Sequence, residues 1–411
     1  MRGSRGEEGE SWKVRDGVGF GTEESRIPGP APRPFSLDYA TTPFLVIWEV
    51  TRACSLHCLH CRADAQFRRD PRELTTEEGF RLLDELAEWK VPLVVLTGGD
   101  PFERPDVFDL VRYGAERGLR MSVTPSATPR VTREALERLK EAGVMRLAVS
   151  LDGARAETHD RFRGTSGSFA QTMRILKIAA ELGIERQVNT TVSRYNVGEM
   201  EKLAGLVAES GAVLWSVFFL VPTGRGRKED AVDYATQEGL YRWLAELADR
   251  APFDIKTTEA QPYRRVLVQR RQMMRGMEGG FGTGGGKPGG TEARRGVFGG
   301  SGRAPRGVND GNGFVFVSHI GEVYPSGFLP IRVGDVHQTS LREIYRDSSV
   351  LRALRDPDGY EGKCGVCEFR RVCGGSRARA YALTGDYLES DPSCPWVPAV
   401  LRDAAEAGGG V

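Results

Sequence analysis

The sequence predicts an α/β fold in which a parallel sheet curls into a partial, open (β/α)6 barrel, with a smaller subdomain at the C-terminus. Short β-branched runs alternate six times with amphipathic helical stretches between residues 44 and 222. Repeated strand–helix units require a parallel sheet with right-handed crossovers, and six units are too few to close an eight-stranded barrel. The seven cysteines fall into two tight groups, one behind the first run and one near the C-terminus.

The chain divides into segments of different composition. Residues 1–40 are rich in Gly, Pro, Arg and Glu. Such a segment cannot bury enough apolar surface to offset its ordering entropy, so we expect a disordered tail. Residues 41–235 hold the barrel core, and a capping-box pattern at Thr75 and Glu78 begins its first helix. The core strands are expected at 44–50, 93–96, 121–124, 146–150, 186–192 and 213–221.

Less regular segments follow the core. Residues 236–275 predict a helical connection with two helices around a short strand. Residues 276–313 are dominated by Gly and Arg, so we expect a flexible loop that is either disordered or a mobile lid. Residues 314–398 predict an auxiliary subdomain with a β-hairpin, a helix beginning at Ser340 and the second cysteine group. Residues 399–411 are expected to form a tail.

The overall composition argues against several classes of protein. The formal net charge of +1 gives no global attraction to nucleic acid or to an anionic membrane surface. No apolar run approaches the ~20 residues that span a bilayer, and the polar first 13 residues do not resemble a secretory signal. Grouped cysteines in odd number indicate metal ligation in a reducing compartment. We therefore expect a cytoplasmic protein with no nucleic-acid or membrane partner.

Cys54, Cys58 and Cys61 stand in the spacing C-x3-C-x2-C directly after the first predicted strand. A four-iron cluster normally takes four thiolates, so three in one loop would leave one iron open to an outside ligand. An open iron indicates chemistry at the cluster and not only electron storage. A zinc loop or a chance grouping is the alternative that the spacing alone leaves open.

This spacing resembles the signature of the radical S-adenosylmethionine (SAM) superfamily. The resemblance implies a partial (β/α)6 TIM-like barrel and a [4Fe-4S] cluster whose open iron binds SAM. It also implies that one electron cleaves SAM to a 5′-deoxyadenosyl radical, which abstracts hydrogen from a substrate. As in full barrels, the site is expected at the C-terminal ends of the strands. His60 stands before the third cysteine, where the superfamily usually has a ring near the adenine.

Further stretches resemble SAM-binding motifs of this superfamily. Gly98-Gly99-Asp100-Pro101 follows the second strand, where glycines let the backbone approach a ligand and free N–H and C=O groups can bind it. The superfamily usually has Glu where this chain has Asp100, but the contact is mainly a backbone one. Read alone, the tetrapeptide predicts a turn. The resemblance implies SAM contacts at His60, Gly98, Gly99, Asp100, Pro101, Ser150, Asp152, Arg163, Asn189, Val221 and Pro222.

The later positions in this set have ordinary alternatives. Ser150 and Asp152 end the fourth strand and are expected near the methionyl and ribose groups, although a polar strand exit explains them equally well. Arg163 can pair with a carboxylate of SAM or substrate, or be solvated. Asn189 on the fifth strand is expected to reach the ribose. At the end of the sixth strand, the backbone of 221–222 is expected to lie against the adenine.

The second cysteine group has the spacing C-x2-C-x5-C-x20-C. Four thiolates close a structural site for zinc or for an iron–sulfur cluster, and spacing does not separate the two. Beside the first motif, the group resembles the SPASM/twitch-type auxiliary module, which implies one auxiliary [4Fe-4S] cluster. Ser326 stands where a full SPASM module has a further cysteine, so one auxiliary cluster is the maximum. The implied ligands are Cys364, Cys367, Cys373 and Cys394.

Phrases around this second group look most like the branch of haem and haem d1 synthesis enzymes. The first hypothesis is a radical SAM enzyme acting on a tetrapyrrole side chain, in the manner of Fe-coproporphyrin oxidative decarboxylation, with a flavodoxin- or ferredoxin-type electron donor. The alternatives are a maturase of a ribosomally made peptide and a non-catalytic iron–sulfur electron carrier. The sequence identifies no catalytic acid or base. The candidate partners for substrate propionates are Arg163, Arg225, Arg227, Arg377 and Arg379.

Overall fold

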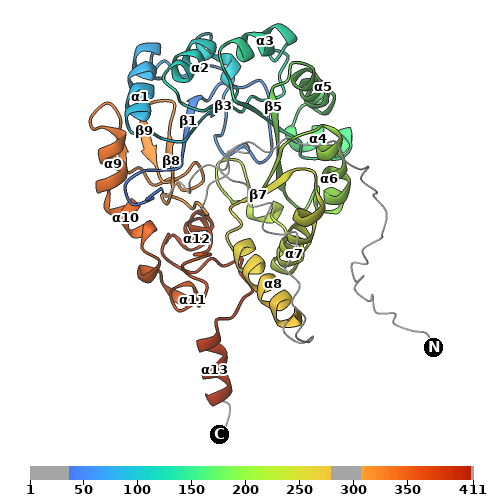
Figure 1. Ribbon diagram of the computed structural model, residues 1–411, viewed down its shortest axis with the longest axis vertical. Coiled ribbons are helices and arrows are strands. Elements are labelled where there is room, and N and C mark those ends of the chain that lie inside the picture. Colours follow the sequence, from blue (N-terminus) through green and yellow to red (C-terminus); the bar gives the residue numbers. More distant parts are fainter. Residues whose placement is uncertain (1–36, 279–306, 409–411) are drawn as a thin grey trace, which may run out of the picture.

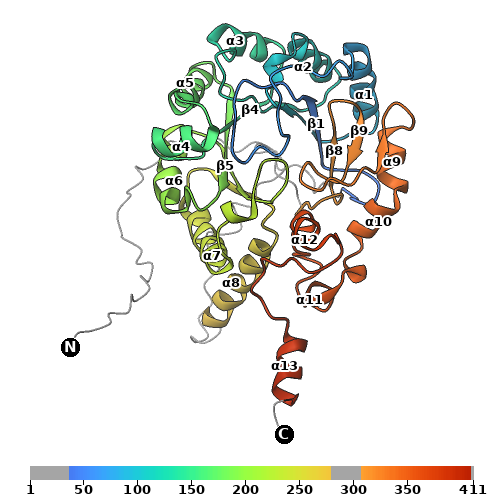
Figure 2. The ribbon, with the colours of Figure 1, turned by 180° about the vertical axis from the view of Figure 1, so that it is seen from behind.

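The computed structural model describes residues 37–278 and 307–408. Most of the expected N-terminal tail and most of the Gly/Arg-rich loop lie outside the described residues. Figures 1 and 2 show a curved sheet with helices along its outer side and the C-terminal segment on its open side. None of the helices in these ranges combines the length and the apolar composition that a membrane span requires.

The strands of the described residues form one sheet, in the strand order β10-β9-β8-β1-β2-β3-β4-β5-β6-β7. Its first six strands match the six predicted ones, and they pair in parallel from β1 to β6. The strands are β1 (Leu45–Thr51), β2 (Leu93–Gly98), β3 (Met121–Val123), β4 (Arg146–Ser150), β5 (Glu185–Val192), β6 (Leu214–Phe219), β7 (Asp254–Thr258), β8 (Phe314–Val317), β9 (Glu322–Tyr324) and β10 (Gly334–Asp335).

The sheet is wider than the six predicted strands. β7 pairs in parallel with β6, and β8 pairs in parallel with β1, so the hairpin of β8 and β9 extends the barrel sheet. The physical reason is that the edges of β1 and β6 would otherwise leave backbone N–H and C=O groups without partners. The auxiliary segment is therefore joined to the barrel through main-chain hydrogen bonds, although its strands lie far away in sequence.

The helices lie mainly on the outer side of the sheet (Figure 1). The expected capping box is present, because Thr75 accepts from the N–H of Glu78 and Glu78 accepts from that of Thr75. The helix expected from Ser340 is divided in two at Ser348, whose side chain caps the second part. The helices are α1 (Thr76–Glu88), α2 (Val107–Glu116), α3 (Arg133–Glu141), α4 (Ala156–Arg163), α5 (Ser168–Glu181), α6 (Met200–Glu209), α7 (Tyr234–Arg250), α8 (Pro262–Glu278), α9 (Leu341–Asp347), α10 (Ser349–Arg355), α11 (Gly362–Gly365), α12 (Arg377–Thr384) and α13 (Ala399–Gly408). The last of these occupies part of the expected C-terminal tail and projects from the body (Figures 1 and 2).

The main core lies between the sheet and the outer helices. In β1, Val46, Trp48 and Val50 are completely buried in this core, as the period of two in a strand requires. The Trp48 ring fits closely over Gly79 of α1, where an added Cβ would stand 2.6 Å from the ring. This packing fixes the level of β1 and hence of the cysteine loop that follows it.

A buried polar bridge joins the chain after β7 to the chain before β8. Ser376 at the start of α12 donates to Glu259, and the N–H of Ala378 donates to Asp310 at 3.1 Å. Gln261 donates to Asn309 at 2.7 Å. Both Asn309 and Asp310 are buried, so this end of the expected flexible loop is part of the folded body. The C-terminal segment thus holds together the two sides of the open barrel.

Candidate active site

Three cysteine thiols gather in the loop after β1, at the C-terminal end of the parallel strands. Cys54 and Cys58 are buried, and all three thiols are free. Backbone N–H groups already point at two of the sulfurs, from Leu56 to Cys54 at 3.3 Å and from Ala65 to Cys61 at 3.4 Å. The loop therefore presents its sulfur atoms in a fixed local geometry.

The cysteine loop is enclosed by turns that come from distant parts of the barrel. Gly164 after α4 lies against the carbonyl of His57, and Gly224 after β6 lies against the carbonyl of Cys61. Both glycines have positive φ, and an added Cβ would collide with these oxygens. Arg225 donates from its backbone N–H to Cys61 and from Nε to the carbonyl of Cys58, both at 2.9 Å. The shape of the loop is thus set largely by contacts to its main chain.

The turn at Gly98–Asp100 is attached to the chain just before Cys54. The N–H of Gly99 donates to Thr51 at 2.8 Å, and the N–H of Asp100 donates to Ala53 at 2.7 Å. The expectation that N–H groups of this turn are free for a ligand is therefore wrong for these two. Protein carbonyls already accept their protons, because both backbones approach too closely to leave space between them. The carbonyls of Gly99 and Asp100 also have partners, since they accept from the Ser126 hydroxyl at 2.7 Å and from the N–H of Glu103 at 2.9 Å. Each carbonyl oxygen keeps a second lone pair that a ligand can use.

The Asp100 side chain has an internal role. Its carboxylate is buried and accepts from the N–H of Phe102 at 3.2 Å and from the Thr128 hydroxyl at 2.6 Å. Burial raises the pKa of Asp100 to about 6, because water no longer solvates the charge. Pro101 begins the short 3-10 helix that Asp100 caps. The Asp100 side chain therefore stabilises the turn through hydrogen bonds within the protein.

Asp152, Arg163 and His60 form a buried group beside the cysteines. Arg163 pairs with Asp152 at 3.3 Å, and the N–H of Thr191 donates to the same carboxylate at 2.7 Å. His60 stacks on Phe162 with ring centroids 4.0 Å apart and lies 3.7 Å from Asp152. Burial lowers the pKa of His60 well below its usual value, so the ring is neutral. The alternative of a solvated Arg163 is excluded, because only 9% of its side chain is exposed.

Arg163 also acts on the Cys58 thiol. Burial raises the pKa of Cys58 to about 11, and the Arg163 guanidinium opposes this increase. A cluster held by three thiolates carries negative charge, and a buried cation beside them offsets part of that charge. The donor set and its surroundings therefore fit a thiolate-bound cluster.

Two of the remaining predicted SAM contacts lie on neighbouring strands. Ser150 at the end of β4 pairs in register with Asn189, which lies inside β5, and Ser216 of β6 continues this transverse row. Asn189 also lines the barrel cavity. The carbonyl of Val221 accepts from the N–H of Thr223 at 2.8 Å, and Pro222 is partly exposed beside it. Ser150, Val221 and Pro222 thus lie at or after the C-terminal ends of their strands, as the cysteine loop does, whereas Asn189 lies three residues before the end of β5.

A large cavity fills the interior of the barrel. Its empty space is about 1050 Å³ when the open solvent at its mouth is counted. Arg62, the residue after Cys61, lines the cavity, so the cavity reaches the cysteine loop. Five phenylalanines contribute to its walls: Phe44, Phe218, Phe314, Phe316 and Phe328. Three of the five come from the strand and turns of the auxiliary segment, which therefore helps to enclose this space.

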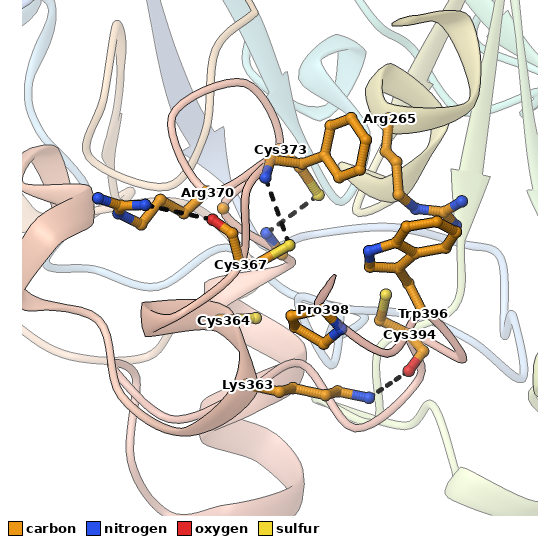
Figure 3. Close-up of a pocket in the computed structure, with 12 residues that line it drawn as sticks. Arg265, Lys363, Cys364, Cys367, Arg370, Cys373, Cys394, Trp396 and Pro398 are labelled. Atoms are coloured by element: carbon orange, nitrogen blue, oxygen red, sulfur yellow. Dashed lines mark hydrogen bonds between the residues drawn. The ribbon is translucent and has the colours of Figure 1, made fainter. Parts of the chain in front are cut away.

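The four C-terminal cysteines line one hollow (Figure 3). Backbone N–H groups point at three of the sulfurs at 3.4 Å: Phe369 to Cys367, Gly375 to Cys373 and Asp391 to Cys364. Arg377 also approaches the Cys364 sulfur at 3.6 Å. Hydrogen bonds to sulfur are one of the features by which proteins adjust the potential of a cluster. Cations on the rim of the same hollow are Arg265, Lys363 and Arg370.

In the described part of the chain, no three His, Cys, Asp or Glu side chains form a group that could hold a metal ion. A four-iron cluster takes one thiolate on each iron, so its cysteines do not have to converge on a single point. Ser326, which stands where a full SPASM module has a further cysteine, lies in a turn. Its hydroxyl accepts from the N–H groups of Phe328 and Leu329 at 3.1 and 3.2 Å.

The arginines outside the predicted SAM contacts that were candidates for substrate carboxylates all have partners within the protein. Arg225 is bound to the cysteine loop, and Arg227 pairs with Asp230 at 3.1 Å. Arg377 donates to the carbonyl of Glu389 at 2.7 Å, and Arg379 to that of Glu259 at 2.6 Å. Their guanidinium groups satisfy backbone carbonyls and carboxylates of the protein itself, which composition does not reveal.

Sequence reasoning also missed two residues next to the cysteine loop and the cavity. Ser126 contacts the Cys54 sulfur at 3.5 Å and donates to the carbonyl of Gly99 at 2.7 Å, which joins the two motifs. Lys256 lines the barrel cavity from β7. The only available signal for Lys256 was a lysine in a short alternating strand, which ordinarily marks a solvated strand face.

Comparisons with known proteins agree with this geometry. Residues 48–207 match the model of the radical SAM superfamily. The AdoMet-dependent heme synthase of Methanosarcina barkeri is 42% identical over 356 residues, which are 87% of this chain and 97% of that protein. The Fe-coproporphyrin III synthase of the same organism is 29% identical, over 92% of this chain and 93% of that protein. The predicted likeness to haem synthesis enzymes is thus confirmed.

A solved structure supports the fold. Streptococcus suis SuiB bound to S-adenosylmethionine superposes with a TM-score of 0.64 over 87% of this chain and 78% of that one, at 15% identity. The predicted fold class is therefore confirmed. The relationship to the heme synthase extends over nearly all of that protein, and the family model covers the cysteine loop and the strand ends around it. We conclude that the chain belongs to the radical SAM superfamily and is an enzyme that uses a [4Fe-4S] cluster and SAM.

Proposed function

We propose that this enzyme acts on the propionate side chains of an Fe-coproporphyrin-like tetrapyrrole and converts them by oxidative decarboxylation. The observation that carries the proposal is the barrel cavity, whose phenylalanine walls can take a flat macrocycle and which reaches Arg62 beside the cysteine loop. Ligand sites are typically apolar with a few placed polar groups. The names of the two relatives, a heme synthase and an Fe-coproporphyrin III synthase, agree with this substrate class.

The cysteine loop is proposed to hold the cluster through Cys54, Cys58 and Cys61. When bound, this cluster supplies the electron that splits SAM into methionine and a 5′-deoxyadenosyl radical. The second lone pairs of the Gly99 and Asp100 carbonyls are suited to accept from an amino group, since the N–H groups of both residues are used within the protein. The buried ion pair of Asp152 and Arg163 is proposed to orient the polar groups of SAM. The predicted SAM contacts at the other strand ends remain part of this proposal.

Oxidative decarboxylation defines what else the protein must provide. Each event removes one hydrogen atom from the propionate carbon attached to the ring, releases CO2, and leaves a vinyl group and one electron. The four C-terminal cysteines are proposed to hold an auxiliary cluster that supplies a one-electron acceptor. A flavodoxin- or ferredoxin-type protein is the proposed external electron donor, and the cytoplasm the proposed location.

Anaerobic incubation of the reconstituted protein with SAM, a reductant and Fe-coproporphyrin III tests the proposal. We expect 5′-deoxyadenosine, methionine and CO2, together with porphyrins in which vinyl groups replace propionates, detected by mass spectrometry. Cys58→Ala serves as the control and should form none of these products. If SAM is cleaved and the porphyrin stays intact while a ribosomal peptide is modified, the tetrapyrrole proposal is wrong and the maturase hypothesis replaces it.

A further inference from the structure

Three cationic side chains line the barrel cavity, and two of them are already paired. Arg62 binds Glu49 at 3.1 Å and lies over the Phe316 ring at 4.7 Å from its centroid. Arg146 binds Glu185 at 2.8 Å. Among the residues that the structure describes, no hydrogen bond or ion pair joins the Lys256 ammonium to another group. The charged groups that act on Lys256 are Arg146 and Arg264, which are both cations.

This environment disfavours the protonated ammonium of Lys256 when no anion lies beside it. Loss of solvation and the two arginines lower the pKa of Lys256 to about 8. Burial and like charge both disfavour the protonated amine, and an anion in the cavity would offset both effects. The cavity therefore offers its one described unpaired cation to a negatively charged ligand.

A second observation on the neighbouring strand also indicates a polar ligand. Ser216 pairs with Lys256 in register, and its strand neighbours Leu214 and Phe218 both line the cavity. Ser216 is completely buried, and its hydroxyl has no hydrogen-bond partner among the described residues. Buried hydroxyl groups are normally paired, so one without a partner requires an explanation. Ser216 itself does not line the cavity, so a ligand oxygen beside Lys256 provides the missing partner only when the side chains that cover the hydroxyl move aside.

The strand register also shows where Ser216 and Lys256 lie relative to the predicted SAM contacts. Ser150, Asn189, Ser216 and Lys256 form one transverse row across β4 to β7. Neighbouring strands lie about 4.8 Å apart, so the backbones of Asn189 and Lys256 are separated by roughly two such steps. A group held at Lys256 thus lies at the same level as the proposed SAM contacts and within the reach of a bound side chain.

We propose that Lys256, assisted by the Ser216 hydroxyl, binds a propionate carboxylate of the tetrapyrrole inside the barrel. This inference rests on the proposed function and deepens it, since it assigns the anchor of the substrate to one residue of this chain. A charge-assisted hydrogen bond from an ammonium to a carboxylate is stronger than a neutral one. The phenylalanine walls bind the macrocycle, and Lys256 selects macrocycles with an acidic side chain at this position.

Binding of Fe-coproporphyrin III to the reconstituted enzyme without reductant, followed by Soret absorbance, tests the role of Lys256 separately from turnover. Lys256→Met removes the charge at nearly the same length and should raise Kd about tenfold or more. Lys256→Arg keeps the charge and should recover a large part of this loss. Ser216→Ala should weaken binding to a smaller extent. The matched control is Lys177→Met on the exposed face of α5, which should bind as the wild type does.

Folding and function are separated by further measurements on the same samples. Iron content and the thermal unfolding midpoint must match those of the wild type, and Lys256→Arg covers the case in which the Met variant does not fold. Unchanged Kd in a folded Lys256→Met variant overturns the assignment of Lys256, while wild-type binding leaves the proposed function standing. Absence of Fe-coproporphyrin III binding by the wild type itself overturns both.

Discussion

The Arg225 guanidinium donates a hydrogen bond from Nε to the main-chain oxygen of Cys58 at 2.9 Å. The same side chain donates to the carbonyl of Ala65 at 3.2 Å. One residue of the turn after β6 therefore binds the cysteine loop on both sides of Cys61. Since the loop comes from β1, this contact connects opposite parts of the sheet and fixes the position of the sulfurs relative to the strand ends.

Arg225→Ala should reduce the iron bound at the first site and slow 5′-deoxyadenosine formation. The loss of two hydrogen bonds from a charged group leaves carbonyls without partners, which costs about 1–3 kcal/mol for each. Iron content and SAM cleavage of the purified protein measure the effect. Arg227→Ala is the matched control, because Arg227 is 62% exposed and pairs only locally with Asp230. Equal iron loss in both variants would show that Arg225 has no special role.

Gly164→Ala should disrupt the cysteine loop. The residue has a φ of +62°, and a Cβ there would collide with the carbonyl of His57. Gly167→Ala is the control, because this glycine has a φ of +83° and nothing within 4 Å of the added Cβ. The control carries only the backbone strain of about 1–2 kcal/mol. We expect iron loss in Gly164→Ala and wild-type iron in a slightly less stable Gly167→Ala, measured by iron assay and thermal unfolding.

The sequence predicts those features of the fold and the site that require a particular type of residue at a particular spacing. Cysteine spacing locates both groups of thiols, and apolar runs locate β1 to β6, because burial selects β-branched residues there. The pairing of β8 with β1 was not predictable, since the Gly/Arg-rich segment between residues 276 and 313 hides which edge the later strand joins. The role of Arg225 could not be predicted, because any residue type can supply the backbone carbonyls to which it donates.

The two cysteine groups should hold separate clusters. The purified protein should carry about eight irons, and both Cys58→Ala and Cys373→Ala should keep roughly half of them. Cys58→Ala should abolish SAM cleavage. Cys373→Ala should still cleave SAM without forming vinyl product, since its thiol lies in the other hollow. Circular dichroism controls for unfolding of the small module. Zinc in place of iron at the C-terminal group would contradict an auxiliary cluster, and wild-type turnover by folded Cys373→Ala would contradict its role as acceptor.

The buried carboxyls of Glu259 and Asp310 should make stability depend on pH. Burial, and the Asp310 charge nearby, raise the pKa of Glu259 above its unfolded value of 4.5. Above that value the folded state therefore binds more protons than the unfolded state, so the free energy of unfolding falls as pH rises toward the folded pKa. This contribution is fully present at lower pH and is lost on the alkaline side.

Glu259→Gln removes the titrating group and keeps an oxygen that can accept from Ser376. We expect the variant to lose less stability than the wild type between pH 6 and pH 9, with the difference largest at the alkaline end. Thermal unfolding midpoints of the anaerobic, cluster-loaded proteins across this range provide the measurement. Glu238→Gln is unsuitable as a control because Glu238 pairs with Arg265 beside the C-terminal cysteines. The exposed Glu201 of α6 provides a neutral comparison as Glu201→Gln. Parallel pH profiles for all three proteins would show that Glu259 is ionised throughout and that the polar bridge between β7 and α12 carries no shared proton.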